Sequence, residues 1–340
     1  MAAASIKEVA QHAGVSLGTV SNVLNRPEMV AEATRKRVLD AIVKLGYVRN
    51  DSARQLRAGR SRTIAIVVLD VANPFFTDVV RGAEQAVEAA GSMLVVCSSG
   101  EDSAREDRHL ELLEEQRVGG ILITPVADGR QPVLNRLIER GIPVVLVDRG
   151  AGTASRCSVA VDDELGGRMA ADHLLDRGHR RIGYVGGPFG IAQVADRYAG
   201  ASAAVAAHPD AELIVEETAS LTVASGRKGA AKLVSLPEGR RPTALFCAND
   251  LLALGVLQEI TARHLRVPDD IAIVGYDDIE FAGAAAVPLS SVRQPREQLG
   301  RTAAELLLEE TRDGAGHRHR HVTFQPELVV RQSSAAQVIP

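Results

Sequence analysis

The sequence predicts a multidomain protein in which a small all-α helix-turn-helix unit precedes a larger α/β unit of two lobes. Residues 5–45 carry capped helix patterns, and from residue 62 onward short apolar runs alternate with amphipathic helix patterns. The length of 340 residues fits two or three domains at roughly 150 residues each. About 270 residues of alternating pattern exceed one comfortable hydrophobic core, so we expect two α/β lobes there.

The first unit is predicted to contain three short helices. Ser5 and Glu8 have the spacing of a capping box, in which each side chain accepts a hydrogen bond from a backbone N–H group. Gly14 permits a sharp turn, and Ser16 is suited to cap the second helix. This is the helix-turn-helix pattern, which fits a helix into the DNA major groove, although short three-helix domains also mediate protein contacts. A third helix runs from about residue 32 to Gly46.

The charge is distributed unevenly between the two units. Residues 1–60 carry ten Lys and Arg against five Asp and Glu, a formal charge of +5, although the whole chain has −4. The remainder is therefore anionic, at −9. Clustered cations favour binding to the phosphate backbone of a nucleic acid. Charge alone does not distinguish that function from a solvated basic face.

Residues 48–60 (VRNDSARQLRAGR) are basic and polar, with Ala53 and Leu56 three residues apart. They fit either a linker or a short helix that is ordered only when bound, because so short a segment is not stably helical in water. Leu56 beside Arg54 suits an apolar wedge in a minor-groove base step, with arginines on the flanking phosphates.

The larger unit is predicted to hold parallel sheets covered on both faces by helices. The expected strands are 64–69, 93–97, 120–123, 143–147, 158–161, 181–185, 243–247 and 271–274, and the helices between them include 77–90, 103–116, 163–177, 226–235 and 250–263. Ligands of open α/β sheets bind beyond the carboxyl ends of the strands. The loops at 70–76, 148, 186–197, 249–250 and 276–278 are therefore the candidate binding loops.

Several classes of protein are not expected from this sequence. No apolar run approaches the roughly 18 residues of a membrane span, and residues 1–14 lack a secretory signal pattern, so we expect a cytoplasmic protein. Cys97, Cys157 and Cys247 are interpreted as reduced core residues rather than disulfide or zinc ligands. The alternating histidines of residues 317–321 fit a solvated basic turn better than a metal site, which is the alternative.

Residues 6–10 and 14–25 together resemble the DNA-binding signature of the lactose-repressor/galactose-repressor (LacI/GalR) family of bacterial transcription regulators. The resemblance extends from about residue 5 to 331, through segments 50–56, 72–76, 178–182, 241–244, 249–250, 274–278 and 294–295. It implies a DNA-binding headpiece joined to a periplasmic-binding-protein-like effector domain that senses a sugar or nucleobase. Carried over by position, the domains would be 1–47 (helix-turn-helix), 48–61 (hinge helix) and 62–340. Lobe one would span about 62–160 and 292–320, and lobe two about 161–291 and 321–331.

The resemblance also implies which residues contact DNA. Leu17, Gly18 and Asn22 occupy the base-reading positions: Asn22 can hydrogen-bond base edges and Leu17 can contact a thymine methyl, whereas Gly18 has no side chain. Residues suited to phosphate contacts and to the hinge are Ser16, Thr19, Ser21 and Asn25, followed by Asn50, Ala53, Arg54 and Leu56. The third helix departs from the family because Ala31 stands where a capping Ser is usual, at a cost of about 1 kcal/mol.

In the effector domain, Arg197, Asn249 and Asp277 fall on the family's ligand-contacting positions. A carboxylate that accepts from two hydroxyls, together with Arg and Asn donors, suits a polyol, so a sugar is the expected effector. Phe75 or Phe76 can present an aromatic face to a ring, while Asp148 contacts either ligand or the interlobe hinge. Gln193, with Ile191, replaces the Thr and Arg of purine-sensing members and so disfavours a nucleobase.

We therefore expect a homodimeric, effector-responsive repressor that binds a near-palindromic operator in double-stranded DNA, with no cofactor and no metal. Ligand and operator binding would be coupled allosterically. One alternative is a periplasmic-type sugar-binding protein without DNA function. The other, a carbohydrate-processing enzyme, rests on the pairs Asp162–Asp163 and Asp277–Asp278, but no nucleophile or cofactor motif accompanies them.

Overall fold

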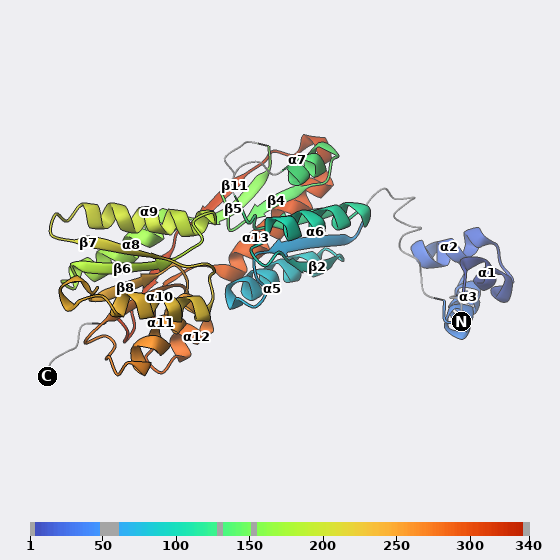
Figure 1. The fold of residues 1–340 in the computed structure, drawn as a ribbon. Helices are drawn as coiled ribbons and strands as arrows, with labels where there is room; N and C mark the ends of the chain where they lie inside the picture. The colour runs from blue at the N-terminus through green and yellow to red at the C-terminus, as the bar shows by residue number, and fades with distance from the viewer. Residues whose placement is uncertain (1–3, 48–60, 128–131, 151–154, 336–340) are drawn as a thin grey trace. The chain divides into compact units, whose positions relative to one another are not determined.

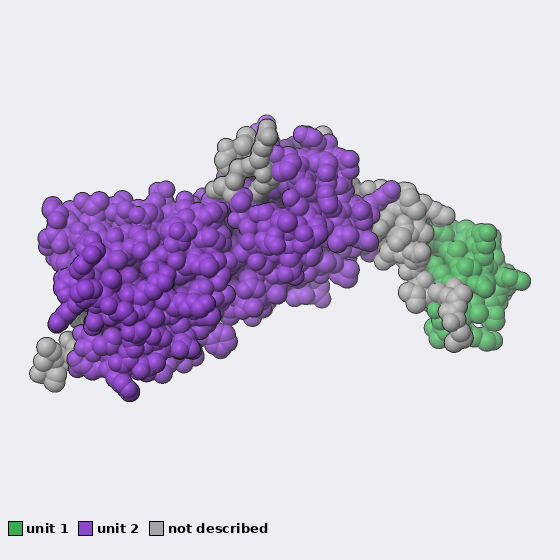
Figure 2. All heavy atoms as spheres, viewed as in Figure 1, with its two compact units in different colours: residues 1–60 green, residues 61–340 purple. Residues whose placement is uncertain are grey.

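The computed structural model of the chain describes residues 4–47, 61–127, 132–150 and 155–335. The chain divides into two compact units, residues 1–60 and residues 61–340 (Figure 2). The predicted hinge residues Asn50, Ala53, Arg54 and Leu56 lie outside the described residues. No described helix is both long enough and apolar enough to cross a membrane.

The described part of the first unit consists of α1 (Ile6–Ala13), α2 (Leu17–Asn25), the 3₁₀ turn η1 (Pro27–Met29) and α3 (Glu32–Leu45). Both bonds of the capping box between Ser5 and Glu8 are present. Gly14 ends α1 in the left-handed conformation, with φ of 63°, which lets the chain turn at once into α2. The helix-turn-helix pattern and its caps are thus confirmed.

A small core holds these helices together. Val9 of α1, Val20 of α2 and Val38 of α3 are fully buried and pack in one apolar cluster. Ala31 offers no side-chain hydrogen bond to the start of α3, as predicted, and Glu32 is the acidic residue in that first turn. A core this small depends strongly on its remaining caps.

The second unit contains two six-stranded sheets, each the centre of one lobe (Figure 1). In lobe one the strand order is β11-β5-β4-β3-β1-β2, and in lobe two it is β12-β10-β9-β8-β6-β7. The strands of lobe one are β1 (Thr63–Val68), β2 (Met93–Ser98), β3 (Gly120–Ile123), β4 (Val144–Val147), β5 (Cys157–Val161) and β11 (His321–Phe324). Those of lobe two are β6 (Arg181–Gly186), β7 (Glu212–Glu217), β8 (Ala244–Cys247), β9 (Ala272–Asp277), β10 (Ser290–Arg293) and β12 (Glu327–Val329).

Helices cover these sheets. Lobe one carries α5 (Pro74–Ala89), α6 (Ser103–Glu115), α7 (Pro132–Glu139), α13 (Arg296–Asp313) and η3 (Gly314–Gly316). Lobe two carries α8 (Asp163–Asp176), α9 (Ala192–Ala206), α10 (Val223–Val234), η2 (Glu238–Arg240), α11 (Asp250–Ala262) and α12 (Glu280–Ala284). The eight strands expected from the sequence are all present as β1–β6, β8 and β9.

Three helix pairs pack through reciprocal glycines. Between α5 and α13, a methyl group on Gly82 would overlap the carbonyl oxygen of Glu297, and one on Gly300 would overlap that of Val79. The same close contacts between a glycine and a carbonyl oxygen of the facing helix join α8 to α9, through Gly167 and Gly200. They also join α10 to α11, through Gly226 and Gly255. Backbones approach this closely only where no Cβ intervenes.

The predicted lobe boundary at residues 320/321 is wrong, because β11 pairs in parallel with β5 and so belongs to lobe one. The chain passes between the lobes after β5, after β10 and after β11. Because of the second passage, α13 (red) packs among the early, blue and teal elements of lobe one (Figure 1). Three crossings put the carboxyl ends of both sheets at the boundary between the lobes.

Candidate functional site

The helix α2 presents the residues expected to read DNA. Leu17 has 45% of its surface exposed, and Gly18 and Asn22 are exposed as well. Val20 and Val23 on the opposite face are buried in the core of the first unit. One face of α2 therefore anchors the helix while the other face lies open to solvent.

The residues expected to contact phosphates also organise the ends of α2. Ser16 Oγ accepts a hydrogen bond from the Thr19 N–H at 3.1 Å and is bonded to Thr19 Oγ1 at 2.9 Å. Asn25 Nδ2 donates to the carbonyl oxygen of Ser21 at 2.8 Å and lies 3.2 Å from its hydroxyl. These polar groups are thus held in fixed positions on the exposed side of the unit.

A cavity lies between the lobes of the second unit, at the carboxyl ends of the strands. All seven residues predicted to contact an effector line it: Phe75, Phe76, Asp148, Gln193, Arg197, Asn249 and Asp277. The lining is completed by Leu69, Asn73, Ile191, Val194 and Leu221, of which Asn73, Ile191 and Val194 lie in the predicted binding loops and Leu69 and Leu221 were missed. Except for Asn73, these are apolar residues at strand or helix ends, and no chemical signal separates them from core residues.

Phe75 and Phe76 reach the cavity because of how α5 begins. Asn73 caps the helix through a hydrogen bond from the Phe75 N–H at 3.0 Å, and Pro74 occupies the first turn. The two rings meet edge to face with centroids 4.9 Å apart. Both residues line the cavity, and both also pack in the core of the second unit.

Arg197 is a buried cation whose guanidinium has partners at Nε, at Nη1 and on one face. Its Nε donates to Asp163 at 2.7 Å, and its Nη1 donates to the carbonyl oxygen of Ala248 at 2.8 Å and lies 3.8 Å from Asp277. Its Cζ lies 3.8 Å above the ring of Tyr276. The adjacent carboxylates raise the pKa of Arg197 despite its burial, so it remains charged.

Asp277, at the end of β9, receives a hydrogen bond from Gln294 Nε2 at 2.8 Å. Burial raises the pKa of Asp277 to about 6, against the opposing effect of Arg197. Asn249 has both ends of its amide in use, because its Oδ1 caps α11 and its Nδ2 donates to the carbonyl oxygen of Leu221 at 3.1 Å. Both side chains are therefore fixed within lobe two.

Asp148 follows β4 in lobe one, and unlike Asn249 it has a polar side-chain atom without a partner in the described residues. Its Oδ2 accepts from Gln193 Nε2 of lobe two at 3.1 Å, but its buried Oδ1 has no hydrogen-bond partner among the described residues. Burial, with Asp163 and Asp277 nearby, raises the pKa of Asp148 well above its ordinary value, although Arg197 opposes this. A buried carboxyl oxygen without a partner is costly, so it favours a donor from a ligand.

Polar contacts join the lobes around this cavity. Besides the contact of Gln193 with Asp148, Arg149 of lobe one lies 3.4 Å from Asp196 of lobe two. Arg296, at the start of α13, pairs with Asp78 of lobe one at 2.7 Å and donates to the carbonyl oxygen of Asp277. These links hold the lobes at their present separation.

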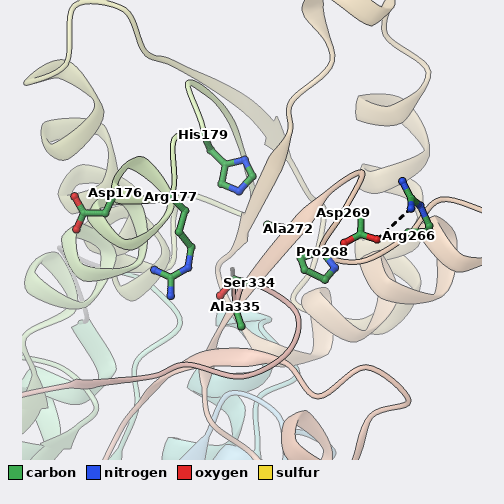
Figure 3. Close-up of a pocket in the computed structure, with 9 residues that line it drawn as sticks. All are labelled: Asp176, Arg177, His179, Arg266, Pro268, Asp269, Ala272, Ser334 and Ala335. Carbon is green, nitrogen blue, oxygen red and sulfur yellow. Dashed lines mark ion pairs between the residues drawn. The ribbon is translucent and has the colours of Figure 1, made fainter. Parts of the chain in front are cut away.

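The interlobe cavity is small, at about 20 Å³, which is room for roughly one water molecule. A larger open cavity of about 520 Å³ lies elsewhere in lobe two, beside Arg177, His179 and Arg266 (Figure 3). Arg266 already pairs there with Asp269 at 3.2 Å. We place the candidate site between the lobes, because buried polar and aromatic groups converge there and not in the open cavity.

Comparison with known proteins supports the same division of the chain. Residues 5–50 match the model of bacterial regulatory proteins of the lacI family, and residues 171–334 match a periplasmic binding protein-like domain. The HTH-type transcriptional repressor PurR of Aliivibrio fischeri (strain MJ11) is 37% identical over 97% of this chain and 98% of its own. The PurR repressor of Photobacterium profundum is 35% identical over the same shares.

Solved structures of transcription regulators are similar to this chain as well. The lac repressor dimer bound to operator and the anti-inducer ONPF matches with a TM-score of 0.85 and 28% identity, over 98% of this chain and 100% of that one. The complex of the transcriptional regulator CelR with cellobiose matches with a TM-score of 0.71 and 32% identity, over 97% and 99%. A regulator from Enterococcus faecium with bound ribose matches with a TM-score of 0.72 and 27% identity, over 80% and 98%.

Fold and sites together define a DNA-binding transcription regulator with a helix-turn-helix headpiece and a two-lobed effector domain. The chain belongs to the lacI family of bacterial regulatory proteins, which confirms the resemblance seen in the sequence. Like its relatives, it is a transcriptional repressor and not an enzyme. The alternative of a transport-type binding protein without DNA function is thereby excluded.

Proposed function

We propose that the protein is a homodimeric repressor whose affinity for a near-palindromic operator is controlled by a sugar or sugar derivative bound between the lobes. The observation that supports the effector most directly is Asp148, whose buried Oδ1 has no hydrogen-bond partner among the described residues. A sugar hydroxyl, which can donate or accept, would hydrogen-bond to it. Asp277 would accept from further hydroxyls, and Arg197 lies beside them as a fixed cation.

The apolar lining favours a sugar over a nucleobase. Aromatic rings come only from Phe75 and Phe76 among the described lining residues, and the other apolar ones are aliphatic. One aromatic wall suits the C–H face of a sugar ring, whereas a flat base gains most between two walls. Two solved neighbours hold cellobiose and ribose. The curated relatives are repressors named PurR, which keeps a nucleobase as the second candidate.

Effector binding requires the lobes to move. A cavity of about 20 Å³ cannot hold a sugar, so the lobes would separate and close again around it. The ligand would replace Gln193 as a partner of Asp148. In a dimer, this movement would shift the two hinge segments relative to each other and change their pairing on DNA. A coupling of about 1–3 kcal/mol between effector and operator is typical of such two-site systems.

At the DNA, we propose that Leu17 and Asn22 read bases from the exposed face of α2, with little direct reading at Gly18. Ser16, Thr19, Ser21 and Asn25 would contact phosphates and fix the register of the helix. In the hinge, outside the described residues, Leu56 would enter the minor groove while Asn50, Ala53 and Arg54 support the helix. Two copies of α2 in a symmetric dimer require two symmetric half-sites.

The effector proposal is tested by a thermal-shift screen of the full-length protein against monosaccharides, disaccharides, sugar phosphates and nucleobases. A bound ligand raises Tm because it binds only the folded state. We expect a sugar to raise Tm, Asp148→Ala to abolish the shift, and Asp210→Ala, at the exposed surface of lobe two, to retain it. A shift caused only by nucleobases would select the second candidate, and an unchanged response of Asp148→Ala would refute the proposed site.

The operator proposal is tested by selecting duplex sites from a random pool and measuring affinity with and without the effector. A palindromic consensus bound by one dimer is expected, with an affinity that falls steeply as salt rises. Binding of one monomer to an asymmetric site would contradict the dimer model.

A further inference from the structure

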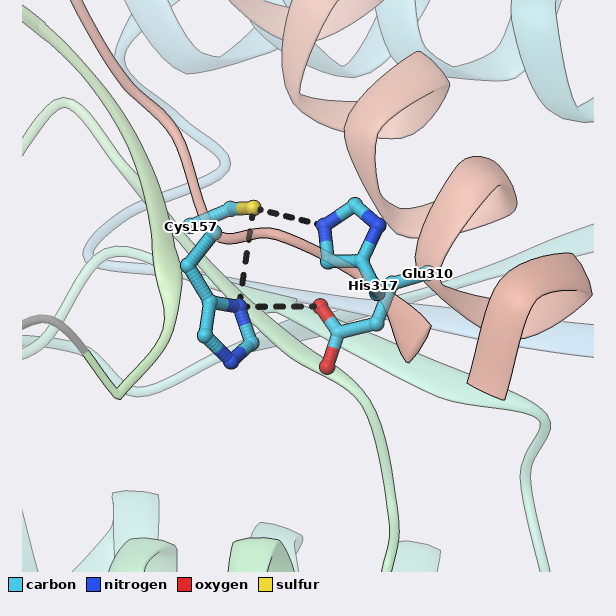
Figure 4. Close-up of side chains that lie close together, drawn as sticks. Cys157, Glu310 and His317 are labelled. Atoms are coloured by element: carbon cyan, nitrogen blue, oxygen red, sulfur yellow. Dashed lines mark hydrogen bonds and ion pairs between the residues drawn. The ribbon is translucent and has the colours of Figure 1, made fainter. Parts of the chain in front are cut away.

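Four side chains from distant parts of the sequence meet at one end of lobe one. Cys157 is the first residue of β5, Glu310 lies in the last turns of α13, and His317 and His319 lie in the segment that leads into β11. The donor atoms of all four lie within 4.8 Å of one another. Figure 4 shows Cys157, Glu310 and His317 pointing toward a common centre.

This cluster corrects one expectation drawn from the sequence. The histidines at 317–321 were expected in a solvated turn, yet the side chain of His317 is only 4% exposed and that of His319 is 26% exposed. Cys157 is a buried free thiol of the core, as expected, and its sulfur also faces both rings. The return of the chain from α13 to β11 brings these groups together.

Three of the distances between the donor atoms approach those around one tetrahedral ion. Cys157 Sγ lies 3.2 Å from His317 Nε2 and 3.8 Å from His319 Nδ1, which in turn lies 3.9 Å from Glu310 Oε2. Ligands at about 2.0–2.3 Å from a zinc ion lie roughly 3.3–3.8 Å from each other. Only small adjustments of these side chains would bring the four donors around one ion.

Hydrogen bonds join Cys157 Sγ to the two rings, but they do not extend to Glu310. The separation of 3.9 Å between His319 and Glu310 is too long for a hydrogen bond, and the buried Glu310 Oε2 has no hydrogen-bond partner among the described residues. A thiolate and a carboxylate together carry the two negative charges that a divalent cation needs. The neighbouring carboxylate of Glu309 is already paired with Arg320.

The surroundings resemble the outer shell of a metal site. The far nitrogen of His317, Nδ1, lies 3.8 Å from Asp313 Oδ2, which is longer than a hydrogen bond but on the side from which a carboxylate orients a ligating imidazole. The backbone N–H of Arg320 donates to Cys157 Sγ at 3.3 Å. The hydrogen bond from Arg320 would fix the sulfur in the orientation that the ion requires.

We propose that Cys157, Glu310, His317 and His319 form a structural zinc site in lobe one. A mixed set of one sulfur, two imidazole nitrogens and one carboxylate oxygen in a tetrahedron is the donor set that Zn²⁺ prefers. The protein supplies all four ligands, which is the pattern of a structural rather than a catalytic site. The ion ties the end of α13 and the edge strand β11 to β5.

The test is metal binding by the tag-free, full-length protein after removal of metal with a chelator. We expect one zinc ion per chain by elemental analysis. Cobalt added as a probe is expected to give a thiolate charge-transfer band and the visible bands of a tetrahedral ion. Zinc should raise Tm by roughly 5 °C or more.

Matched variants locate the ion. Cys157→Ser and His317→Gln are expected to lose both the stoichiometric zinc and the cobalt bands, whereas Cys97→Ser and His321→Gln, which change the same residue types outside the cluster, retain them. Should Cys157→Ser not fold, Glu310→Gln, at the end of α13, provides the same comparison. Absence of stoichiometric binding in the wild type, or full binding by His317→Gln or Glu310→Gln, would overturn the proposal.

Discussion

The two lobes share one sheet order but contribute differently to the cavity between them. Lobe two supplies Arg197 and Asn249, whose polar atoms are already bonded to groups of the same lobe, such as Asp163 and the carbonyl oxygen of Leu221. Lobe one supplies Asp148, whose one side-chain hydrogen bond is to Gln193 across the boundary. Lobe two is therefore a preorganised half of the site, and lobe one is the half that depends on a partner.

This difference suggests how binding is coupled to lobe movement. A preorganised half loses little conformational entropy when a ligand arrives, so it can provide much of the affinity. The unpartnered oxygen of Asp148 gains a donor only when lobe one closes on something that carries one. We infer that lobe two captures the effector and that Asp148 makes closure depend on it.

The largest effect on stability is expected from Arg197→Met in lobe two. The substitution leaves the buried carboxylate of Asp163 without its cation, which costs about 3–5 kcal/mol in the free energy of unfolding. Asp148→Asn in lobe one should change that free energy by less than about 1 kcal/mol, because burial already favours the neutral carboxyl and so raises the pKa of Asp148.

The measurement is urea unfolding at pH 7, followed by circular dichroism because the chain has no Trp. Equal losses in the two variants would contradict the division into a preorganised and a dependent half.

The glycine contacts provide a second comparison. Gly167→Ala in lobe two and Gly82→Ala in lobe one each force a methyl group against a backbone carbonyl, at a cost of about 1–3 kcal/mol. The carbonyl that Gly167 faces belongs to Arg197, whereas Gly82 faces Glu297, which does not line the cavity. We therefore expect Gly167→Ala to weaken effector binding and Gly82→Ala to leave it unchanged.

Calorimetric titration with the effector identified by the thermal-shift screen measures this difference. Equal affinities of the two variants would show that the position of α9 does not set the geometry of the site.

Local chemistry made the first unit predictable from the sequence. Ser5, Gly14 and Ser16 act on backbone groups within three or four residues, so their spacing alone identifies the caps. The seven effector residues were found through the family resemblance and the rule that ligands bind at the carboxyl ends of strands. The resemblance did not reveal that the side-chain atoms of Arg197 and Asn249 are already engaged.

Features that depend on contacts between distant segments could not be predicted. Strand β7 is an edge strand with acidic residues at both ends, so its apolar run is short. The position of β11 depends on where the chain crosses back from lobe two. Cys157 and His317 are 160 residues apart, and nothing in the local sequence of either one indicates the other.

The smallest expected effect concerns pH, to which the lobes should respond with opposite signs. In lobe one, burial raises the pKa of Glu106 to about 7, although a hydrogen bond from the Val126 N–H opposes this. Folding therefore favours protonated Glu106. The contribution of this carboxyl to the free energy of unfolding is fully present below about pH 4.5 and is lost as the pH rises through 7.

In lobe two, burial and then Arg177 lower the pKa of His173 to about 4. Folding therefore favours the neutral imidazole, whose contribution is present above about pH 6.5 and is lost as the pH falls through 4.

We expect Glu106→Gln, which can still accept from Val126, to stabilise the protein by about 1–2 kcal/mol at pH 8 and to have little effect at pH 4.5. His173→Gln should reduce the loss of stability between pH 6.5 and 4.5 and leave the behaviour at alkaline pH unchanged. Urea unfolding of both variants and the wild type across this range measures the two trends. If Glu106→Gln shifted the free energy of unfolding by the same amount at pH 4.5 and pH 8, the buried carboxyl would not be the group that titrates in lobe one.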